Sequence, residues 1–392
     1  MSYNFDTIID RKNTNSIKYD FGLERKKRED LLPLWVADMD FSLPDVVLDD
    51  IHAAVSHGIF GYSDVKDEYF QTLYRWFDKN FHFQPEREWL VKTPGVVYAI
   101  AIAIKAFTKP KDAVLIQQPV YYPFSETIRD NDRIVVNNQL VYEDGSYHID
   151  FDDFEQQIIT HKVKLFLLCS PHNPVGRVWT KEELTKLGDI CRKHHVIILS
   201  DEIHCDFTYP GYVHTMFPTI NEDFALNSIL CTAPSKTFNL AGLQTSNIFI
   251  ANQELRKLFL HEVSASGYSQ LNTLGLVACQ SAYKKGEAWL NELREYLHGN
   301  LTFVEEYLRE NIPQIKLVKP QGTYLLWLDC SALGLTYKEL EHLVIDKARL
   351  WLDGGIIFGK ASALFERINI ACPRSILKQA LDQLAHAINT KE

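Results

Sequence analysis

A lysine follows the end of a short apolar segment near the middle of the chain. Residues 228–231 (Ser-Ile-Leu-Cys) predict a buried strand, which Pro234 ends just before Ser235 and Lys236. A lysine at the inner end of a buried strand loses hydration, so the pKa of its amine falls, and a neutral amine can form a Schiff base with an aldehyde cofactor. A solvated lysine in a loop is the ordinary alternative, and the Ser-Lys pair alone does not exclude it.

Four other polar motifs also follow predicted buried strands: Gly95-Val96-Val97, Pro119-Val120-Tyr121, Asn173-Pro174-Val175-Gly176 and Asp201-Glu202-Ile203-His204. The strands are continuous apolar runs separated by helical patterns, which predicts a mostly parallel sheet with both faces covered. Open α/β sheets bind ligands at the carboxyl ends of their strands. We therefore expect these motifs and Lys236 to meet at one ligand site.

The residue types suit an aromatic aldehyde with a basic ring nitrogen and a ring hydroxyl. Lys236 would form the imine, and Asp201 would keep the ring nitrogen protonated so that the ring can accept electrons. Asn173 could donate to the ring hydroxyl, and Tyr121 could stack on the ring. Tyr121 is preferred to Tyr122 for its offset from the preceding proline, although either tyrosine could instead belong to the core.

A phosphate on the same ligand would find a place at a strand-to-helix turn. Gly95 separates a predicted strand from a predicted helix, so the backbone N–H groups of Gly95, Val96 and Val97 can face an anion. Ser235 could add a hydroxyl donor. Many such turns carry a glycine for steric reasons alone, so this signal is weak without the others.

The chain divides by its sequence texture into three parts. We expect an N-terminal arm that forms part of a small domain over residues 1–45, a large cofactor-binding α/β domain over 46–286, and a small α+β domain over 287–392. The arm contains an apolar segment with two aspartates, residues 31–41. This segment either packs the arm on the core or lines the substrate site, and we assign Ala37 to substrate binding.

Three local patterns give further predictions. Residues 66–80 have the spacing of a helix with one apolar side, formed by Tyr69, Phe70, Leu73, Trp76 and Phe77. Residues 322–328 alternate like a strand with one polar face, and residues 352–355 resemble a turn.

Composition excludes several classes of protein. A formal net charge of −10 argues against nucleic acid or an anionic membrane as the main partner. The seven cysteines form no C-x-x-C pair, which predicts no metal site and fits a reducing compartment. The N-terminus lacks the order of a signal peptide, and the longest apolar run is too short to cross a bilayer. We expect a soluble cytoplasmic protein.

Taken in order, the motifs resemble those of a known family. Gly95, Tyr121, Asn173-Pro174-Val175-Gly176, Asp201, Ser235-Lys236 and Arg367 are similar to the pattern of fold-type I enzymes dependent on pyridoxal 5'-phosphate (PLP), in the class I/II aminotransferase superfamily. The resemblance runs from about Leu31 to the C-terminal helix and implies a seven-stranded-type, mostly parallel sheet. Residues 33–41, 93–97, 200–204 and 235–239 look like the cystathionine β-lyase branch, the MalY/PatB-type carbon–sulfur lyases.

The resemblance also implies roles that the residues alone do not give. Arg367 matches the arginine that binds the substrate α-carboxylate, although it could instead form a structural ion pair. His204 stands where aspartate aminotransferases carry a tyrosine near the ring hydroxyl, and it could also be a satisfied histidine at a strand end. Gln244 stands where a phosphate-binding arginine is usual. Tyr62 would reach the phosphate of a neighbouring subunit, which implies a homodimer with shared sites.

The expected activity is β-elimination from a cysteine thioether such as cystathionine, with a thiol, pyruvate and ammonia as products. The amine of Lys236 would remove the α-proton, and Arg367 would orient the substrate for that step. An aminotransferase shares these early steps and is the first alternative. A non-catalytic regulatory protein that keeps the PLP fold is the second, but the presence of Lys236, Asp201 and Arg367 disfavours it.

Overall fold

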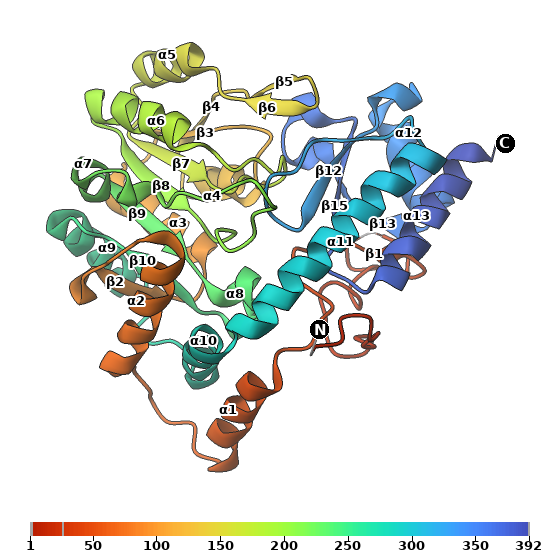
Figure 1. The fold of residues 1–392 in the computed structure, drawn as a ribbon. Coiled ribbons are helices and arrows are strands. Elements are labelled where there is room, and N and C mark those ends of the chain that lie inside the picture. Colours follow the sequence, from red (N-terminus) through yellow and green to blue (C-terminus); the bar gives the residue numbers. More distant parts are fainter. Residues whose placement is uncertain (1–2, 26, 391–392) are drawn as a thin grey trace.

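The computed structural model describes residues 3–25 and 27–390, and its centre is a seven-stranded sheet (Figure 1). The strand order is β2-β10-β9-β8-β7-β3-β4, and only β10 runs opposite to its neighbours in this sheet. The bounds are Leu90–Thr93 (β2), Ala113–Ile116 (β3), Ile134–Asn137 (β4), Leu165–Cys169 (β7), Ile197–Asp201 (β8), Ser228–Thr232 (β9) and Ser246–Phe249 (β10). The prediction of a mostly parallel α/β sheet is confirmed.

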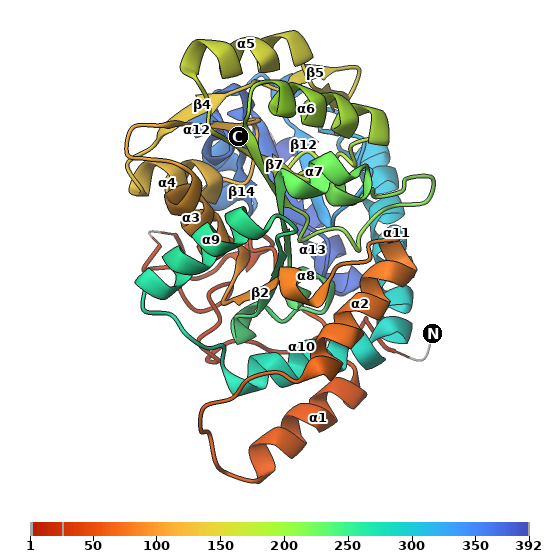
Figure 2. The same ribbon diagram turned by 90° about the vertical axis from the view of Figure 1, so that its left-hand side faces the viewer.

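Helices cover both faces of this sheet because successive strand residues point to opposite sides. In β7, Leu165 and Leu167 pack in the core under α3, α4 and α9, whereas Phe166 and Leu168 pack in the core under α5, α6 and α7. Figure 2 shows the first three helices together on one side of the sheet. Their bounds are Val96–Phe107 (α3), Pro123–Asp130 (α4), Gln253–Ala265 (α9), Phe151–His161 (α5), Lys181–Lys193 (α6) and Glu222–Leu226 (α7).

The helices α1, α2 and α10 lie at the β2–β10 end of the large sheet, and α11 connects this end with the second sheet. The bounds are Asp45–Ser56 (α1), Asp67–Phe81 (α2), Thr273–Lys285 (α10) and Glu287–Asn311 (α11). In α2 the apolar residues predicted to share one face are all buried: Tyr69, Phe70, Leu73, Trp76 and Phe77. The long α11 runs from beside α8 (Pro234–Thr237) toward the second sheet (Figure 1).

The second sheet is antiparallel and contains four strands in the order β11-β12-β15-β14. These strands and their helices are Lys316–Leu317 (β11), Leu325–Asp329 (β12), Phe365–Asn369 (β15), Asp353–Gly354 (β14), Tyr337–His342 (α12) and Arg374–Asn389 (α13). The N-terminal arm joins this region, since β1 (Leu32–Pro33) pairs with β13 (Leu350–Trp351). The division at residues 45 and 286 stays a prediction.

Two local predictions in this region are wrong. We expected residues 322–328 to form a strand with one polar face, but all five residues of β12 are buried. The cause is packing on both faces, including a stack of Trp327 on Phe365 with ring centroids 5.3 Å apart. We expected residues 352–355 to form a turn, but Asp353 pairs with Arg367 in the sheet. A β5–β6 hairpin (Val141–Glu143, Ser146–His148) also escaped the sequence analysis.

Three findings bear on the class of protein. In the part of the chain that the structure describes, no helix has the length and apolar character needed to cross a membrane. The same residues contain no group of three or more His, Cys, Asp or Glu side chains arranged to hold a metal ion. The seven cysteines are buried and free.

Candidate active site

Three of the predicted site residues follow three adjacent strands of the large sheet. Asp201 ends β8, and its backbone is level with Cys169 at the end of β7 and with Cys231 near the end of β9. Asn173 lies four residues after β7 ends, and Lys236 lies four residues after β9 ends. The carboxyl ends of β7, β8 and β9 therefore bring these side chains to one edge of the sheet, as predicted.

Lys236 lies on the short helix α8, which starts at Pro234 directly after β9. A hydrogen bond fixes the position of this helix: the Thr237 hydroxyl donates to the buried Asp206 carboxylate at 2.6 Å. The Lys236 amine donates a hydrogen bond to the Ala37 carbonyl at 2.8 Å. Burial, with a smaller effect of Arg367, lowers the pKa of Lys236 to about 8 against the opposing charges of Asp38 and Asp201. Near physiological pH most of the amine is still protonated, but the neutral fraction is far larger than for an ordinary lysine with a pKa of 10.5.

Asp201 is a buried acid at the end of β8, with 5% of its surface exposed. Burial raises its pKa to about 7, although the Ile203 N–H, which donates to it at 3.2 Å, and the Lys236 charge favour the carboxylate. Within the described residues no cation lies within ion-pair distance of Asp201. A protonated ring nitrogen of a bound ligand would supply the missing positive charge.

Arg367 lies on β15 and is 3% exposed, so its guanidinium is desolvated. It donates to the Asn173 side-chain oxygen at 3.0 Å and to the Trp35 carbonyl at 2.7 Å, and it forms an ion pair with Asp353. Its Nε has no hydrogen-bond partner among the described residues. The structural ion pair that we considered as an alternative therefore exists, but a donor remains for a substrate carboxylate.

Tyr121 and His204 lie among the same groups. The backbone N–H of Tyr121 donates to the Asn173 carbonyl at 3.0 Å, and burial raises the pKa of its phenol. His204 is 4% exposed, and its Nδ1 has no partner in the described part of the chain. Burial, together with the charges of Lys236 and Arg367, lowers the pKa of His204 well below its usual value. The imidazole is therefore neutral and leaves one polar atom unsatisfied.

The strand-to-helix turn predicted to bind a phosphate has free space around Gly95. Gly95 precedes the first turn of α3, and a Cβ placed on it would meet no atom within 4 Å. Val96 and Val97 begin the helix, where backbone N–H groups lack partners within the helix itself. Ser235 lies in α8 beside Lys236. An anion can therefore approach the start of α3 at Gly95 without displacing a side chain.

Tyr62 does not join the other site residues within this chain. It lies in the connection between α1 and α2 and is 98% exposed. It shares a surface hollow of about 580 Å³ with Phe60, Gln244 and Leu271, among others. Gln244, which stands at the usual arginine position, thus faces the same hollow as Tyr62. Whether a second subunit fills that hollow stays a prediction.

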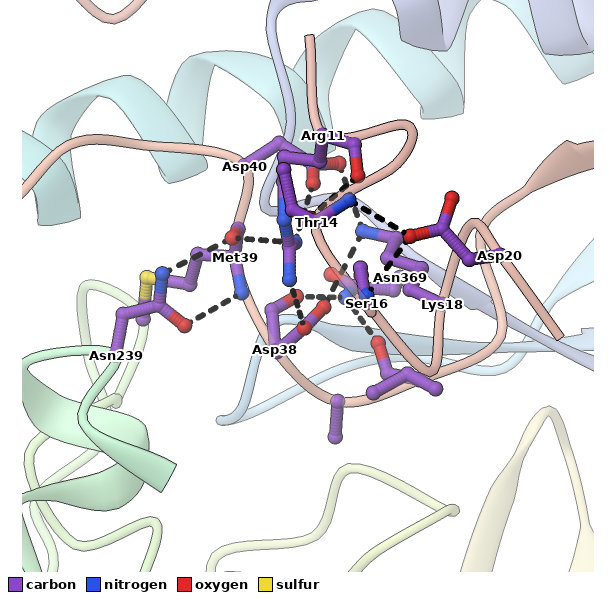
Figure 3. Close-up of polar contacts among 12 residues, drawn as sticks. Arg11, Thr14, Ser16, Lys18, Asp20, Asp38, Met39, Asp40, Asn239 and Asn369 are labelled. Atoms are coloured by element: carbon purple, nitrogen blue, oxygen red, sulfur yellow. Dashed lines mark hydrogen bonds and ion pairs between the residues drawn. The ribbon is translucent and has the colours of Figure 1, made fainter. Parts of the chain in front are cut away.

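The sequence analysis missed several residues that shape the site. Asp353 pairs with Arg367, and the Tyr324 hydroxyl donates to the Ala37 carbonyl at 3.0 Å. Asn369 and Asn239 hold the backbone around Ala37, and Figure 3 shows Asn239 reaching Met39. Asp353, Tyr324 and Asn369 lie in or next to the second sheet, so the pattern of strand ends that found Lys236 and Asp201 could not find them. Asn239 follows β9 beyond α8 and belongs to the 235–239 motif, but the sequence did not show that it binds Met39.

The comparisons with known proteins agree with this site. A family model described as aminotransferase class I and II matches residues 29–384. Cystathionine beta-lyase PatB of Bacillus subtilis is 39% identical over 98% of this chain and 100% of its own length. The crystal structure of cystalysin from Treponema denticola, which contains PLP, superposes with a TM-score of 0.95 at 39% identity, covering 99% of both chains.

A PLP-bound carbon–sulfur lyase from Staphylococcus hominis is also similar, with a TM-score of 0.92 at 35% identity over 99% of this chain and 98% of its own. The site and these matches together define the class of protein. The chain belongs to the class I and II aminotransferase family and, within it, to the branch of the PatB-type carbon–sulfur lyases. The resemblance inferred from the motifs is confirmed.

Proposed function

We propose that this protein is a PLP-dependent carbon–sulfur β-lyase that cleaves cystathionine or a related cysteine thioether. Cystathionine and water would give homocysteine, pyruvate and ammonia. The observation that carries the proposal is the Lys236 amine, which lies at the edge of the sheet with its pKa lowered to about 8. Two of the three relatives named above are described as a cystathionine beta-lyase and a carbon–sulfur lyase, which favours elimination over transamination.

The residues present fit PLP by their own chemistry. Asp201 is a buried acid in need of a cation, Gly95 leaves room for a phosphate at a helix start, and His204 and Arg367 keep unpartnered polar atoms. When bound, PLP supplies an electron-accepting ring that stabilises negative charge on the substrate Cα. Asp201 would hold the proton on the ring nitrogen.

Two residues would do the work on the substrate. Arg367 would bind the α-carboxylate, and its contact with Asn173 orients the guanidinium for that task. Lys236 would hold the cofactor and then, as a free amine, remove the proton from Cα. The Ala37 carbonyl accepts a hydrogen bond from the Lys236 amine, which fixes the position of the amine when it is free.

The test is the release of pyruvate and free thiol from cystathionine by the purified PLP-loaded protein with no 2-oxo acid added. We expect many turnovers, with pyruvate and thiol in equal amounts. Turnover only in the presence of a 2-oxo acid, without thiol release, would identify an aminotransferase and overturn the proposal. A protein that takes up PLP but shows neither reaction would be the regulatory alternative.

We also propose that the active unit is a homodimer in the cytoplasm. The connection between α1 and α2 exposes Ile59, Phe60 and Tyr62 at 74%, 60% and 98%. Exposed apolar side chains that adjoin one another are typical of an interface, and the hollow beside them could accept a second copy. Free buried cysteines suit a reducing compartment.

Phe60→Asp should convert the dimer to a monomer, because a carboxylate would be buried without a partner in the interface. Sedimentation equilibrium measures the mass, and activity should fall with it because Tyr62 would no longer reach the partner's phosphate. Val213→Asp is the matched control, since Val213 is 81% exposed and lies outside this connection. A Phe60→Asp chain that remains dimeric would refute the assignment of this face.

A further inference from the structure

The N-terminal arm contains a cluster of four charges that the roles described above do not use. Arg11 contacts Asp38 at 2.7 Å and Asp40 at 2.8 Å, and Lys18 contacts Asp40 at 2.7 Å and Asp38 at 3.5 Å. Figure 3 shows Arg11 between the two carboxylates. Two cations and two anions thus face each other across the arm.

This cluster is unusually well buried for an arm near a chain terminus. Lys18 is 1% exposed and Asp40 is 5% exposed. Although burial disfavours the ammonium, the charges of Asp40 and Asp38 raise the pKa of Lys18 above its usual value, so it stays charged. Desolvating an ion pair costs about as much as the pair regains, so such a cluster contributes little to stability. What the cluster can provide is a fixed position for the parts of the chain that carry its four charges.

The loop that carries the two cations has a fixed shape of its own. The Asp20 carboxylate accepts backbone N–H groups of Asn13, Thr14 and Ser16 at 2.9–3.0 Å. The Thr14 hydroxyl donates to the Arg11 carbonyl at 2.6 Å. These bonds fold residues 11–20 back on themselves, so Arg11 and Lys18 reach the same two carboxylates from one loop.

The carboxylates belong to the segment that covers Lys236, which we call the 35–41 segment. Its Ala37 carbonyl accepts the Lys236 amine at 2.8 Å. Two asparagines also hold it: Asn239 bonds both backbone atoms of Met39 at 2.9 Å, and Asn369 donates to the Val36 and Asp38 carbonyls at 2.6 Å. At its start, Arg367 donates to the Trp35 carbonyl at 2.7 Å. The asparagines and Arg367 bind the backbone of the segment, whereas Arg11 and Lys18 bind its two carboxylates.

We propose that Arg11 and Lys18 are positioning residues for Lys236: they hold the 35–41 segment in place and thereby the Ala37 carbonyl against the lysine amine. The inference rests on the proposed role of Lys236, but it concerns the protein before any reaction. It applies whether the enzyme eliminates or transaminates. Arg11 and Lys18 contact neither Lys236 nor Asp201, so they act only through the segment.

The charged groups around Lys236 come from three elements, and the segment provides one of them. Asp38 lies on the segment, Asp201 ends β8, and Arg367 lies on β15. The neutral His204 and the phenol of Tyr324 complete the surroundings. If the segment moves away, Lys236 loses Asp38 but gains water. Burial is the largest cause of its lowered pKa, so release should raise that pKa toward the ordinary value.

The experiment compares apoprotein variants by two measurements that need no turnover. Hydrogen–deuterium exchange of the peptide that contains residues 35–41 reports whether the segment is held. The pH dependence of Lys236 modification by trinitrobenzenesulfonate, followed by peptide mass spectrometry, reports the apparent pKa of its amine. In the wild type the midpoint should lie near pH 8.

Arg11→Met and Lys18→Met should each speed exchange in the 35–41 segment by about 10-fold or more and raise the Lys236 midpoint by about one pH unit. Arg11→Lys and Lys18→Arg should restore most of the protection, because they keep the charge. Lys12→Met is the matched control: it removes the same charge from the same loop, its side chain is exposed, and it should change neither measurement.

Three outcomes would overturn the proposal. One is a folded Arg11→Met chain with unchanged exchange and an unchanged midpoint. Another is a raised midpoint of Lys236 modification with unchanged exchange, because the cations would then act on the Lys236 pKa through their charge alone and not by holding the segment. The third is an equal response in Lys12→Met. Should Lys18→Met fail to fold, Arg11→Met decides, because its guanidinium is one-quarter exposed and its loss leaves Lys18 in place.

Discussion

Lys236→Ala should lower turnover of cystathionine by a factor on the order of 10³ or more, because one substitution removes both the attachment of the cofactor and the base that takes the Cα proton. The fold should persist, since Thr237 keeps its bond to Asp206 and the Ala37 carbonyl keeps the Tyr324 hydroxyl. Initial rates of pyruvate release measure the loss. Borohydride reduction should attach PLP covalently to the wild type and not to the variant.

Chemical rescue separates the role of the amine from a general effect on the fold. Added methylamine should restore part of the activity of Lys236→Ala, and the rescue should increase with pH as methylamine loses its proton. Lys257→Ala, which removes an exposed lysine, serves as the control and should keep full activity. A Lys236→Ala enzyme that retains wild-type turnover would refute the assigned role of this residue.

The sequence predicted the part of the site that depends on local pattern. Asp201, Asn173 and Lys236 each follow a continuous apolar strand, and parallel strands bring their carboxyl ends to one edge. The pattern of apolar residues along the chain is a local signal, so each strand could be located in the sequence without knowing which strands it pairs with. The resemblance to a family added Arg367, which lies on another sheet and which no spacing could connect with Lys236.

Contacts between distant segments were beyond the sequence analysis. Asp353 reaches Arg367 because β14 pairs with β15, and a two-residue strand carries no periodicity. Lys18 and Asp40 are both common surface residue types, and their burial follows from how the arm folds over residues 35–41. The polar face expected on β12 was wrong for a related reason: alternation shows which residues are polar, but not what packs on each face.

Asp201→Asn should make the apoprotein more stable at neutral pH while it disables the enzyme. In the wild type burial raises the pKa of Asp201 from 3.8 to about 7. Between these values the folded state holds a proton that the unfolded state has released, so wild-type stability falls as pH rises from about 4 to 7. Asparagine has no such proton. Its stability advantage should therefore increase by roughly 2–4 kcal/mol over this range.

Urea unfolding of the two apoproteins at pH 4, 5.5 and 8 measures this difference, and a pH-independent difference would contradict the raised pKa of Asp201.

With PLP bound, the wild type should be more stable than the variant, because the wild-type carboxylate gains the protonated ring nitrogen as its partner and asparagine does not. Turnover of the variant should fall by about 10²-fold or more, as expected when a charge aimed at the reacting system is lost. N-methylated PLP, whose ring carries a permanent positive charge, should recover part of that activity. The same carboxylate therefore destabilises the apoprotein and activates the holoenzyme. The free energy that its burial costs in the apoprotein is recovered as binding free energy when the cofactor binds.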